Sequence, residues 1–383
     1  MRLVDEFRDP TLARALAARI AREASPHRTY RIMEFCGGHT HAIFRHGLHD
    51  LLPPNVRYVH GPGCPVCVLP VARVDAAIEL VERHGVILAT YGDMMRVPGS
   101  DRRSLLAARA AGADVRMVGS TLDALQLART NRDREVVFLA IGFETTTPPT
   151  AVAVRAAAAE ELGNFTVFCN HVLTPPAMDR ILEDSPDPEA PGVAIDAVLG
   201  PSHVSTIIGT TPYAGIAARH RRPVVITGFE PLDVMQATLM AIRQLNAGRH
   251  EVENQYTRVV TRDGNGKARA LVADVLEVRP RFEWRGLGTL ASSALQLRER
   301  YAAFDAERRF ALTGSTAREV RGCACPEVLR GVTTPPECKL FGTVCTPDNP
   351  MGACMVSSEG ACAAYWSYGR HRRAAEPTAR EIA

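Results

Sequence analysis

Short apolar runs alternate with amphipathic stretches over most of the chain. The apolar runs predict eight strands, at residues 31–35, 56–61, 85–93, 114–120, 136–144, 165–170, 196–200 and 223–230. Apolar residues at helical spacing lie between several of them, at residues 74–84, 121–131, 151–163 and 231–247. Strand, loop and helix in repeated order predict an α/β fold whose parallel sheets carry helices on both faces.

The tripeptide GFE follows a predicted strand twice, at residues 142–144 and 228–230, and each copy opens into a helix. This repetition favours two smaller sheets over one large sheet. The predicted units are an α/β domain at 1–120, to which a later segment can return, a second α/β domain at 121–250 and a C-terminal part at 251–383. Within the last part we expect a polar hairpin at 259–272 and a charged helix at 290–310.

Unusual loop sequences follow directly after the predicted strands. They are CGGHTH (36–41), GPGCPVC (61–67), YGDMMRVPGS (91–100), GFETTTPP (142–149) and GPSHVST (200–206). In open parallel sheets, ligands bind beyond the carboxyl ends of the strands. The sequence therefore predicts that one cleft gathers these loops.

The charge pattern argues against a nucleic-acid partner. Lys and Arg number 45 and Asp and Glu number 42, so the net charge is only +3, and no basic block stands out. No run approaches the roughly 18 apolar residues of a membrane span. Residues 1–10 carry charges where a signal peptide has its apolar core. We expect a cytoplasmic protein with no membrane partner.

Cysteine is concentrated near the C-terminus, where six of the ten cysteines lie within residues 323–362. The cytosol keeps thiols reduced, so such a cluster is typical of metal binding or redox chemistry. An iron–sulfur cluster takes four thiolates, whereas structural zinc prefers closely spaced cysteine pairs. Since Cys323 and Cys325 form the only close pair here, the spacing favours a [4Fe-4S] cluster.

Five motifs in this sequence together resemble those of a known protein family. They are CGGHTH, GPGCPVC, GFETT, PSHVS and, near the end, GACMVSSEGACAAY. The chain resembles the HypD family of hydrogenase maturation proteins over nearly its whole length. The resemblance implies two Rossmann-like domains facing a cleft and a third part that bears an iron–sulfur cluster. It also implies a role in building the Fe(CN)2CO group of [NiFe]-hydrogenases, in a complex with the chaperone HypC and in contact with the cyanide donor HypE.

The cluster environment of this family is similar to that of ferredoxin:thioredoxin reductase. There, one cysteine of a C-x-C motif binds iron and the other joins a redox-active disulfide. By that resemblance, Cys325 and Cys354 form a redox pair in this chain. The cluster ligands are then Cys323, Cys338, Cys345 and Cys362.

Cys36 is the candidate ligand for the Fe(II) of the Fe(CN)2CO precursor. A thiolate is a soft donor that suits iron carrying cyanide and carbon monoxide. His39 can lower the pKa of the thiol or orient a ligand. The alternative is a buried free cysteine at a strand end, with His39 capping the next helix. His41 fits either interpretation equally well.

Cys64 and Cys67 form a C-x-x-C motif with no charged residue between them. Such a pair closes into a small disulfide or binds a metal with help from elsewhere. Zinc would need a second pair, so we favour a dithiol/disulfide switch or an iron site shared with Cys36. A purely structural disulfide is the alternative, and the reducing compartment argues against it.

Asp93, Glu144 and His203 stand in the other strand-end motifs. They could position the diatomic ligands of iron, take protons or cap helices. Residues 145–147 are threonines, but the glycine-rich phosphate cradle is missing from the sequence, so we expect no conventional nucleotide site.

The sequence thus predicts a scaffold with redox activity rather than a conventional turnover enzyme. Cys36 and a thiolate of HypC hold iron while cyanide and carbon monoxide are added. The tail cluster supplies electrons through Cys325 and Cys354 and then through Cys64 and Cys67. The rival hypothesis is a cluster-dependent disulfide reductase that acts on a protein substrate and holds no iron at Cys36.

Overall fold

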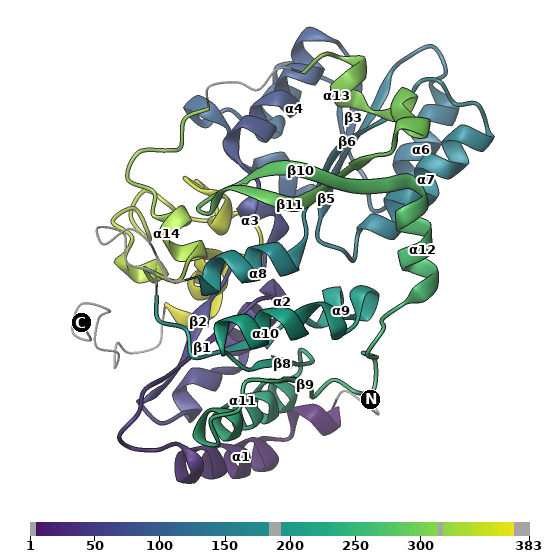
Figure 1. The fold of residues 1–383 in the computed structure, drawn as a ribbon. Helices are drawn as coiled ribbons and strands as arrows, with labels where there is room; N and C mark the ends of the chain where they lie inside the picture. The colour runs from purple at the N-terminus through teal and green to yellow at the C-terminus, as the bar shows by residue number, and fades with distance from the viewer. Residues whose placement is uncertain (1–4, 184–192, 313–316, 371–383) are drawn as a thin grey trace.

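The computed structural model describes residues 5–183, 193–312 and 317–370, which contain two parallel sheets and one antiparallel hairpin (Figure 1). Sheet A has the order β2-β1-β7-β8-β9, with β1 Tyr30–Glu34, β2 Val56–His60, β7 Ala197–Gly200, β8 Val224–Ile226 and β9 Val252–Asn254. Sheet B has the order β4-β3-β5-β6, with β3 Ile87–Thr90, β4 Val115–Met117, β5 Val136–Gly142 and β6 Phe165–His171. The hairpin pairs β10 (Leu276–Trp284) with β11 (Gly288–Leu297).

The predicted α/β class with two parallel sheets is confirmed. All eight predicted strands are present, as β1 to β8. The chain crosses between the sheets, because β3 to β6 form sheet B and β7 to β9 return to sheet A beside β1. Residues 1–120 therefore contribute strands to both sheets. How the chain divides into folding domains stays a prediction.

Helices fill most of the connections between strands, and the four predicted helices are present as α4, α6, α7 and α11. The α-helices of the described residues are α1 Pro10–Glu23, α2 Gly37–His46, α3 Pro65–Val68, α4 Val71–Arg83, α5 Leu105–Ala110, α6 Thr121–Thr130, α7 Thr147–Ala159, α8 Thr174–Leu182, α9 Ser202–Ile208, α10 Ala214–His220, α11 Pro231–Asn246, α12 Gly266–Val275, α13 Ala306–Arg309, α14 Cys325–Leu329 and α15 Ala361–Ala364. Within the described ranges, none of the helices has the length and apolar character needed to cross a membrane.

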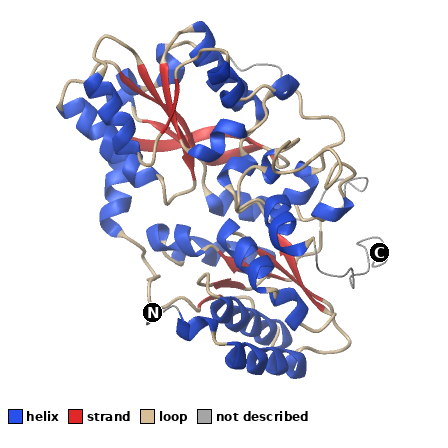
Figure 2. Cartoon of the chain, turned by 180° about the vertical axis from the view of Figure 1, so that it is seen from behind, coloured by secondary structure: helices blue, strands red, loops and turns tan. Residues whose placement is uncertain are grey.

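Each sheet has one outer face with its own core and one inner face that shares a core with the other sheet (Figures 1 and 2). Helices α1 and α11 cover the outer face of sheet A, and α6, α7 and α12 cover that of sheet B. The shared core also takes in α3, α4, the hairpin and the cysteine-rich tail. Every residue of β5 and β6 is buried, which explains their continuous apolar sequences.

Two predictions for the segment after β9 are wrong. The polar hairpin expected at 259–272 gives way to α12, because Asn265 caps this helix by accepting a hydrogen bond from the backbone N–H of Ala268 at 3.0 Å. The charged helix expected at 290–310 is instead β11 followed by short helical turns. Its alanines and leucines adopt a strand because β10 pairs with them and sheet B buries Ala294 and Leu297.

Glu307 of α13 ties the hairpin to sheet B. It accepts a hydrogen bond from Arg73 of α4 at 2.5 Å and another from Arg279 of β10. The guanidinium of Arg73 also lies over the ring of Phe168 in β6, 4.1 Å from the ring centroid. Burial raises the pKa of Glu307, but the hydrogen bonds from the two arginines outweigh burial and lower the pKa to about 2.

Replacing Glu307 with alanine should destabilise the protein by about 3 kcal/mol, because it leaves two largely buried arginines without their counter-charge. The free energy of unfolding in urea, followed by circular dichroism at pH 7, measures this loss. Glu299→Ala is the matched control, since Glu299 pairs with Arg308 at the surface and its loss should hardly change the free energy of unfolding. Equal losses in the two variants would contradict the role assigned to Glu307.

Candidate functional site

Cys36 lies where β1 ends and α2 begins. It is the N-cap residue of α2, and its backbone N–H donates to Oε2 of the buried Glu34 at 3.0 Å. The GPGCPVC loop after β2 packs directly against it, because a Cβ atom on Gly63 would come within 2.5 Å of the Cys36 backbone nitrogen. The two opening motifs of the sequence therefore form one structural unit at the carboxyl ends of β1 and β2.

The thiol of Cys36 is buried, with only 7% of the residue exposed. Burial raises the pKa of this thiol well above its ordinary value, and the carboxylates of Glu359 and Glu34 raise it further. Hydrogen bonds from the backbone N–H groups of Gly38 and His203 act in the opposite direction. His203 belongs to α9 and Glu359 to the tail, so distant segments meet at this sulfur. The raised pKa favours the protonated form of this thiol.

The two histidines of the CGGHTH motif have different surroundings. His39 is fully buried, and its Nε2 lies 3.1 Å from Ser202 Oγ and 3.3 Å from the carbonyl oxygen of Thr227. Burial lowers the pKa of His39, which favours the neutral ring. His41 is partly buried, and its Nε2 lies 3.1 Å from the hydroxyl of Tyr368. His39 thus links α2 to α9 and to the end of β8, and its predicted role toward iron stays a prediction.

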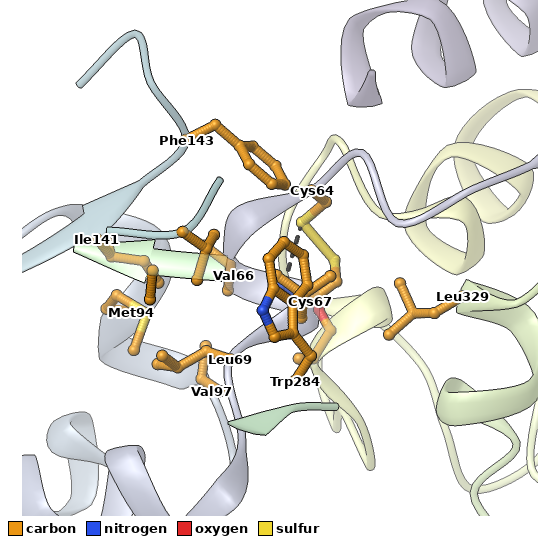
Figure 3. Packing of buried hydrophobic residues seen from close by; sticks show 14 of the residues in the cluster. Cys64, Val66, Cys67, Leu69, Met94, Val97, Ile141, Phe143, Trp284 and Leu329 are labelled. Atoms are coloured by element: carbon orange, nitrogen blue, oxygen red, sulfur yellow. Dashed lines mark hydrogen bonds between the residues drawn. A yellow bond between two sulfur atoms is a disulfide. The ribbon is translucent and has the colours of Figure 1, made fainter. Parts of the chain in front are cut away.

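Cys64 and Cys67 are joined in a disulfide across the first turn of α3, with their Cα atoms 5.3 Å apart. Because the two sulfurs are bonded to each other, neither is available as a metal ligand in this oxidation state. Cys67 Sγ lies 3.9 Å from the carbonyl oxygen of Ala353, the residue before Cys354. Figure 3 shows the disulfide among the buried side chains of Phe143, Trp284 and Leu329.

The tail cysteines form a continuous group of sulfur atoms. Hydrogen bonds link Cys323 to Cys325, Cys325 to Cys354, and Cys354 to Cys362. Cys345 lies close enough to Cys323 and Cys338 for their charges to interact. Gly352 permits this packing, since a Cβ atom there would come within 2.6 Å of Cys323 Sγ. Cys325 and Cys354, the predicted redox pair, are therefore direct neighbours.

The chemistry of the tail thiols suits an iron–sulfur cluster better than their arrangement does. Across residues 5–183, 193–312 and 317–370, no three His, Cys, Asp or Glu side chains converge as a preformed metal site. Of the six tail cysteines, Cys323 is half-buried and the others are buried. Soft, water-shielded thiolates are the ligands that such clusters take, and four are enough. The selection of Cys323, Cys338, Cys345 and Cys362 as ligands stays a prediction.

Glu144 brings the GFETT loop of sheet B to the same region. Its carboxylate accepts a hydrogen bond from the backbone N–H of Thr174 at 2.9 Å and another from the Thr174 hydroxyl at 3.0 Å. Burial raises the pKa of Glu144 to about 7, against the lowering effect of those hydrogen bonds. The charges of Glu144 and Cys36 both act on the buried hydroxyl of Tyr213. Both groups therefore influence the pKa of Tyr213, which their charges raise further after burial.

Sequence reasoning missed two residues of this region. Tyr213 lies just before α10 and is fully buried in the core that the two sheets share. Glu359 lies in the SSEGAC stretch of the tail, and burial, Asp93 and Glu34 together raise its pKa. A lone carboxylate within a cysteine-rich stretch was the only signal for Glu359, and nothing in the sequence marks Tyr213.

A cavity of about 550 Å³ lies apart from the sulfur atoms. Arg28, Arg222 and Arg249 line it. These residues precede β1, β8 and β9, so the cavity lies at the amino ends of the sheet A strands, whereas Cys36 follows the carboxyl end of β1. None of the cysteines lines this cavity.

Comparison with known proteins gives a consistent result. A family model described as HypD, hydrogenase formation hypA family, matches residues 11–369. The chain is 62% identical to hydrogenase maturation factor HypD of Rhizobium leguminosarum bv. viciae, with 97% of each chain covered. It is 61% identical to the protein of the same name from Azotobacter vinelandii, covering 99% of this chain and 100% of that one. Against the Escherichia coli K12 protein of that name the identity is 48%, covering 96% and 98%.

Glu144 should make the stability of the protein depend on pH. The unfolded chain ionises this carboxyl near 4.5 and the folded chain only near 7, so the free energy of unfolding falls as pH rises between these values and then levels off. Glu144→Gln mimics the protonated carboxyl and removes this component. From pH 4.5 to pH 8 the variant should gain about 3 kcal/mol relative to the unchanged chain. Urea unfolding at several pH values checks this, and a difference that stays constant with pH would contradict it.

Proposed function

The chain belongs to the HypD family of hydrogenase maturation factors, and from that premise we propose that it is the scaffold on which the Fe(CN)2CO group of [NiFe]-hydrogenases is assembled. The observation that carries this proposal is the surroundings of Cys36. Its sulfur is buried where the end of β1 meets the loop after β2, the start of α9 and the tail. A ligand bound at this sulfur would be held by all of these segments together.

Iron is the substrate of this site. When Fe(II) binds, Cys36 loses its proton and the thiolate becomes a ligand, so that the metal charge replaces the proton charge. The nearby carboxylates of Glu34 and Glu359 raise the pKa of the free thiol, and the same negative field attracts a cation. Buried thiolate and carboxylates together favour Fe(II) over a neutral ligand.

Partners complete the coordination of the iron. One protein thiolate leaves most coordination positions open, so we propose that a HypC-type chaperone contributes a second thiolate. A HypE-type protein then delivers cyanide to the open positions. This assembly suits a cytoplasmic setting, where the thiols stay reduced until iron arrives.

The tail is proposed to hold a [4Fe-4S] cluster through Cys323, Cys338, Cys345 and Cys362. Such a cluster supplies single electrons when bound. The other two tail cysteines, Cys325 and Cys354, are hydrogen-bonded neighbours and are proposed to reduce the Cys64–Cys67 disulfide. In this exchange the two tail thiols form a disulfide, the α3 disulfide becomes two thiols, and two electrons and two protons move from the tail to α3.

The rival hypothesis, a disulfide reductase acting on a diffusing protein substrate, has less support. Such an enzyme needs its dithiol within reach of the substrate. Cys64 is 2% exposed and Cys67 is 0% exposed, so a partner protein could not reach either sulfur without rearrangement of α3. Burial therefore favours an internal relay over an external substrate.

Removal of the Cys36 thiol tests the scaffold proposal. The Cys36→Ala variant, purified without oxygen together with its HypC-type partner, should lack the infrared bands of metal-bound cyanide and carbon monoxide and lose the iron bound outside the tail. The visible absorption of the tail should be unchanged, because no tail ligand is altered. Cys169→Ala is the matched control, since this buried thiol contacts the carbonyl oxygen of Leu295 in the hairpin at 3.3 Å. Infrared bands that survive in Cys36→Ala would overturn the scaffold proposal.

A further inference from the structure

Arg285 occupies the tip of the β10–β11 hairpin, between the α3 disulfide and the tail. The hairpin runs from sheet B toward the cysteine-rich tail (Figure 1). At its turn, Gly286 has a φ of +80°, and a Cβ atom there would come within 2.7 Å of the carbonyl oxygen of Pro326 in α14. Pro326 directly follows Cys325. The tip therefore packs against the helix that begins at a tail cysteine.

The same tip is bonded to the end of α3. The backbone N–H of Arg285 donates to the carbonyl oxygen of Val68 at 2.8 Å, and its Nε donates to the carbonyl oxygen of Leu69 at 3.0 Å. These two residues directly follow Cys67. Nη1 lies 3.3 Å from Oε2 of Glu319. The hairpin tip thus joins the disulfide helix to the tail.

One donor of this guanidinium has no partner. The side chain of Arg285 is only 1% exposed, and its Nη2 atom is buried with no hydrogen-bond acceptor among the described residues. A buried donor without a partner costs about 1–3 kcal/mol, and more when the group is charged. The carboxylate that contacts this guanidinium is that of Glu319, and it leaves Nη2 without an acceptor.

We propose that Arg285 is a positioning residue for the redox chemistry of this protein: it holds a fixed, buried positive charge at the end of the helix that carries the Cys64–Cys67 disulfide. This inference rests on the proposed reduction of the Cys64–Cys67 disulfide, and it adds the group that makes the reduced state favourable. Reduction of a disulfide creates thiols that ionise in part, and a nearby cation stabilises that reduced form. Arginine suits the place because it stays charged when buried and offers several donors in a fixed plane.

The test is the midpoint potential of the Cys64–Cys67 disulfide in the full chain. Protein held without oxygen in thiol/disulfide buffers of graded potential is quenched with iodoacetamide, and mass spectrometry gives the reduced fraction of each cysteine peptide. Arg285→Gln should shift the equilibrium about tenfold toward the disulfide, which is about 30 mV more negative. Arg285→Lys keeps the charge and should restore most of the shift. Arg281→Gln, on the exposed face of the same hairpin, should leave the potential unchanged.

A charge effect and a packing effect give different results. If Arg285→Lys shifts the potential as far as Arg285→Gln, the fork of hydrogen bonds matters and the charge does not, which overturns the proposal. If neither variant shifts it, the proposal also fails. A variant that does not fold is recognised by its melting curve.

Glu319→Gln keeps the proposal testable in that case. Glu319 is 45% exposed, so its replacement should leave the fold intact while removing the carboxylate that partly neutralises Arg285. The Cys64–Cys67 equilibrium should then move two- to threefold in the opposite direction, toward the dithiol, and an unchanged potential would count against the proposal. The peptides of Cys325 and Cys354 report separately on the relay. If those thiols never form a disulfide in the unchanged chain, the relay under the proposed function fails, whereas Arg285 is still judged on Cys64 and Cys67.

Discussion

The close approach of glycine backbone to two cysteines, Cys36 and Cys323, is the constraint on which the rest of this structure depends. At Gly63 the loop after β2 lies against the backbone of Cys36, and at Gly352 the tail lies against Cys323 Sγ. At both positions a Cβ atom would be closer than atoms can approach. These contacts leave no room for a side chain, so the loop after β2 lies directly against Cys36 and the segment at Gly352 directly against Cys323. The site therefore depends on how these loops meet around the cysteines in the folded chain, and not on the order of the motifs along the sequence.

Burial of so much sulfur determines the electrostatics of the site. A thiol away from water resists ionisation, and the carboxylates near Cys36 increase that resistance. A cation must therefore be present wherever a thiolate is needed. At Cys36 the proposed cation is the iron that the site receives, and beside the tail it is the guanidinium of Arg285, which the hairpin carries into the core. The bound iron and the arginine would thus supply positive charge at two different places in the sulfur-rich region.

The sequence predicted the architecture well because periodicity reports directly on burial. β5 and β6 are continuous apolar runs and are buried at every residue. Prediction failed after β9, where local signals conflict with long-range pairing: Asn265 begins a helix within a turn-like sequence, and the helix-like residues of β11 follow their partner β10. The cysteines of the site could be found from their spacing and neighbours. Tyr213, Glu359 and Arg285 could not, because their roles come from segments that meet only in the folded chain.

The most direct test of this account is whether a tail sulfur reaches the α3 disulfide. The account requires the sulfur of Cys354 to come within exchange distance of Cys67, whose Sγ lies 3.9 Å from the carbonyl oxygen of Ala353, the residue before Cys354. In a double variant with Cys64→Ser and Cys325→Ser, Cys67 and Cys354 each lack their usual partner, so mild oxidation should trap a disulfide between them. Mass spectrometry of the digested protein should find the peptides of Cys67 and Cys354 joined. Recovery of Cys67 as a free thiol, with Cys354 joined only to other tail cysteines, would contradict the account.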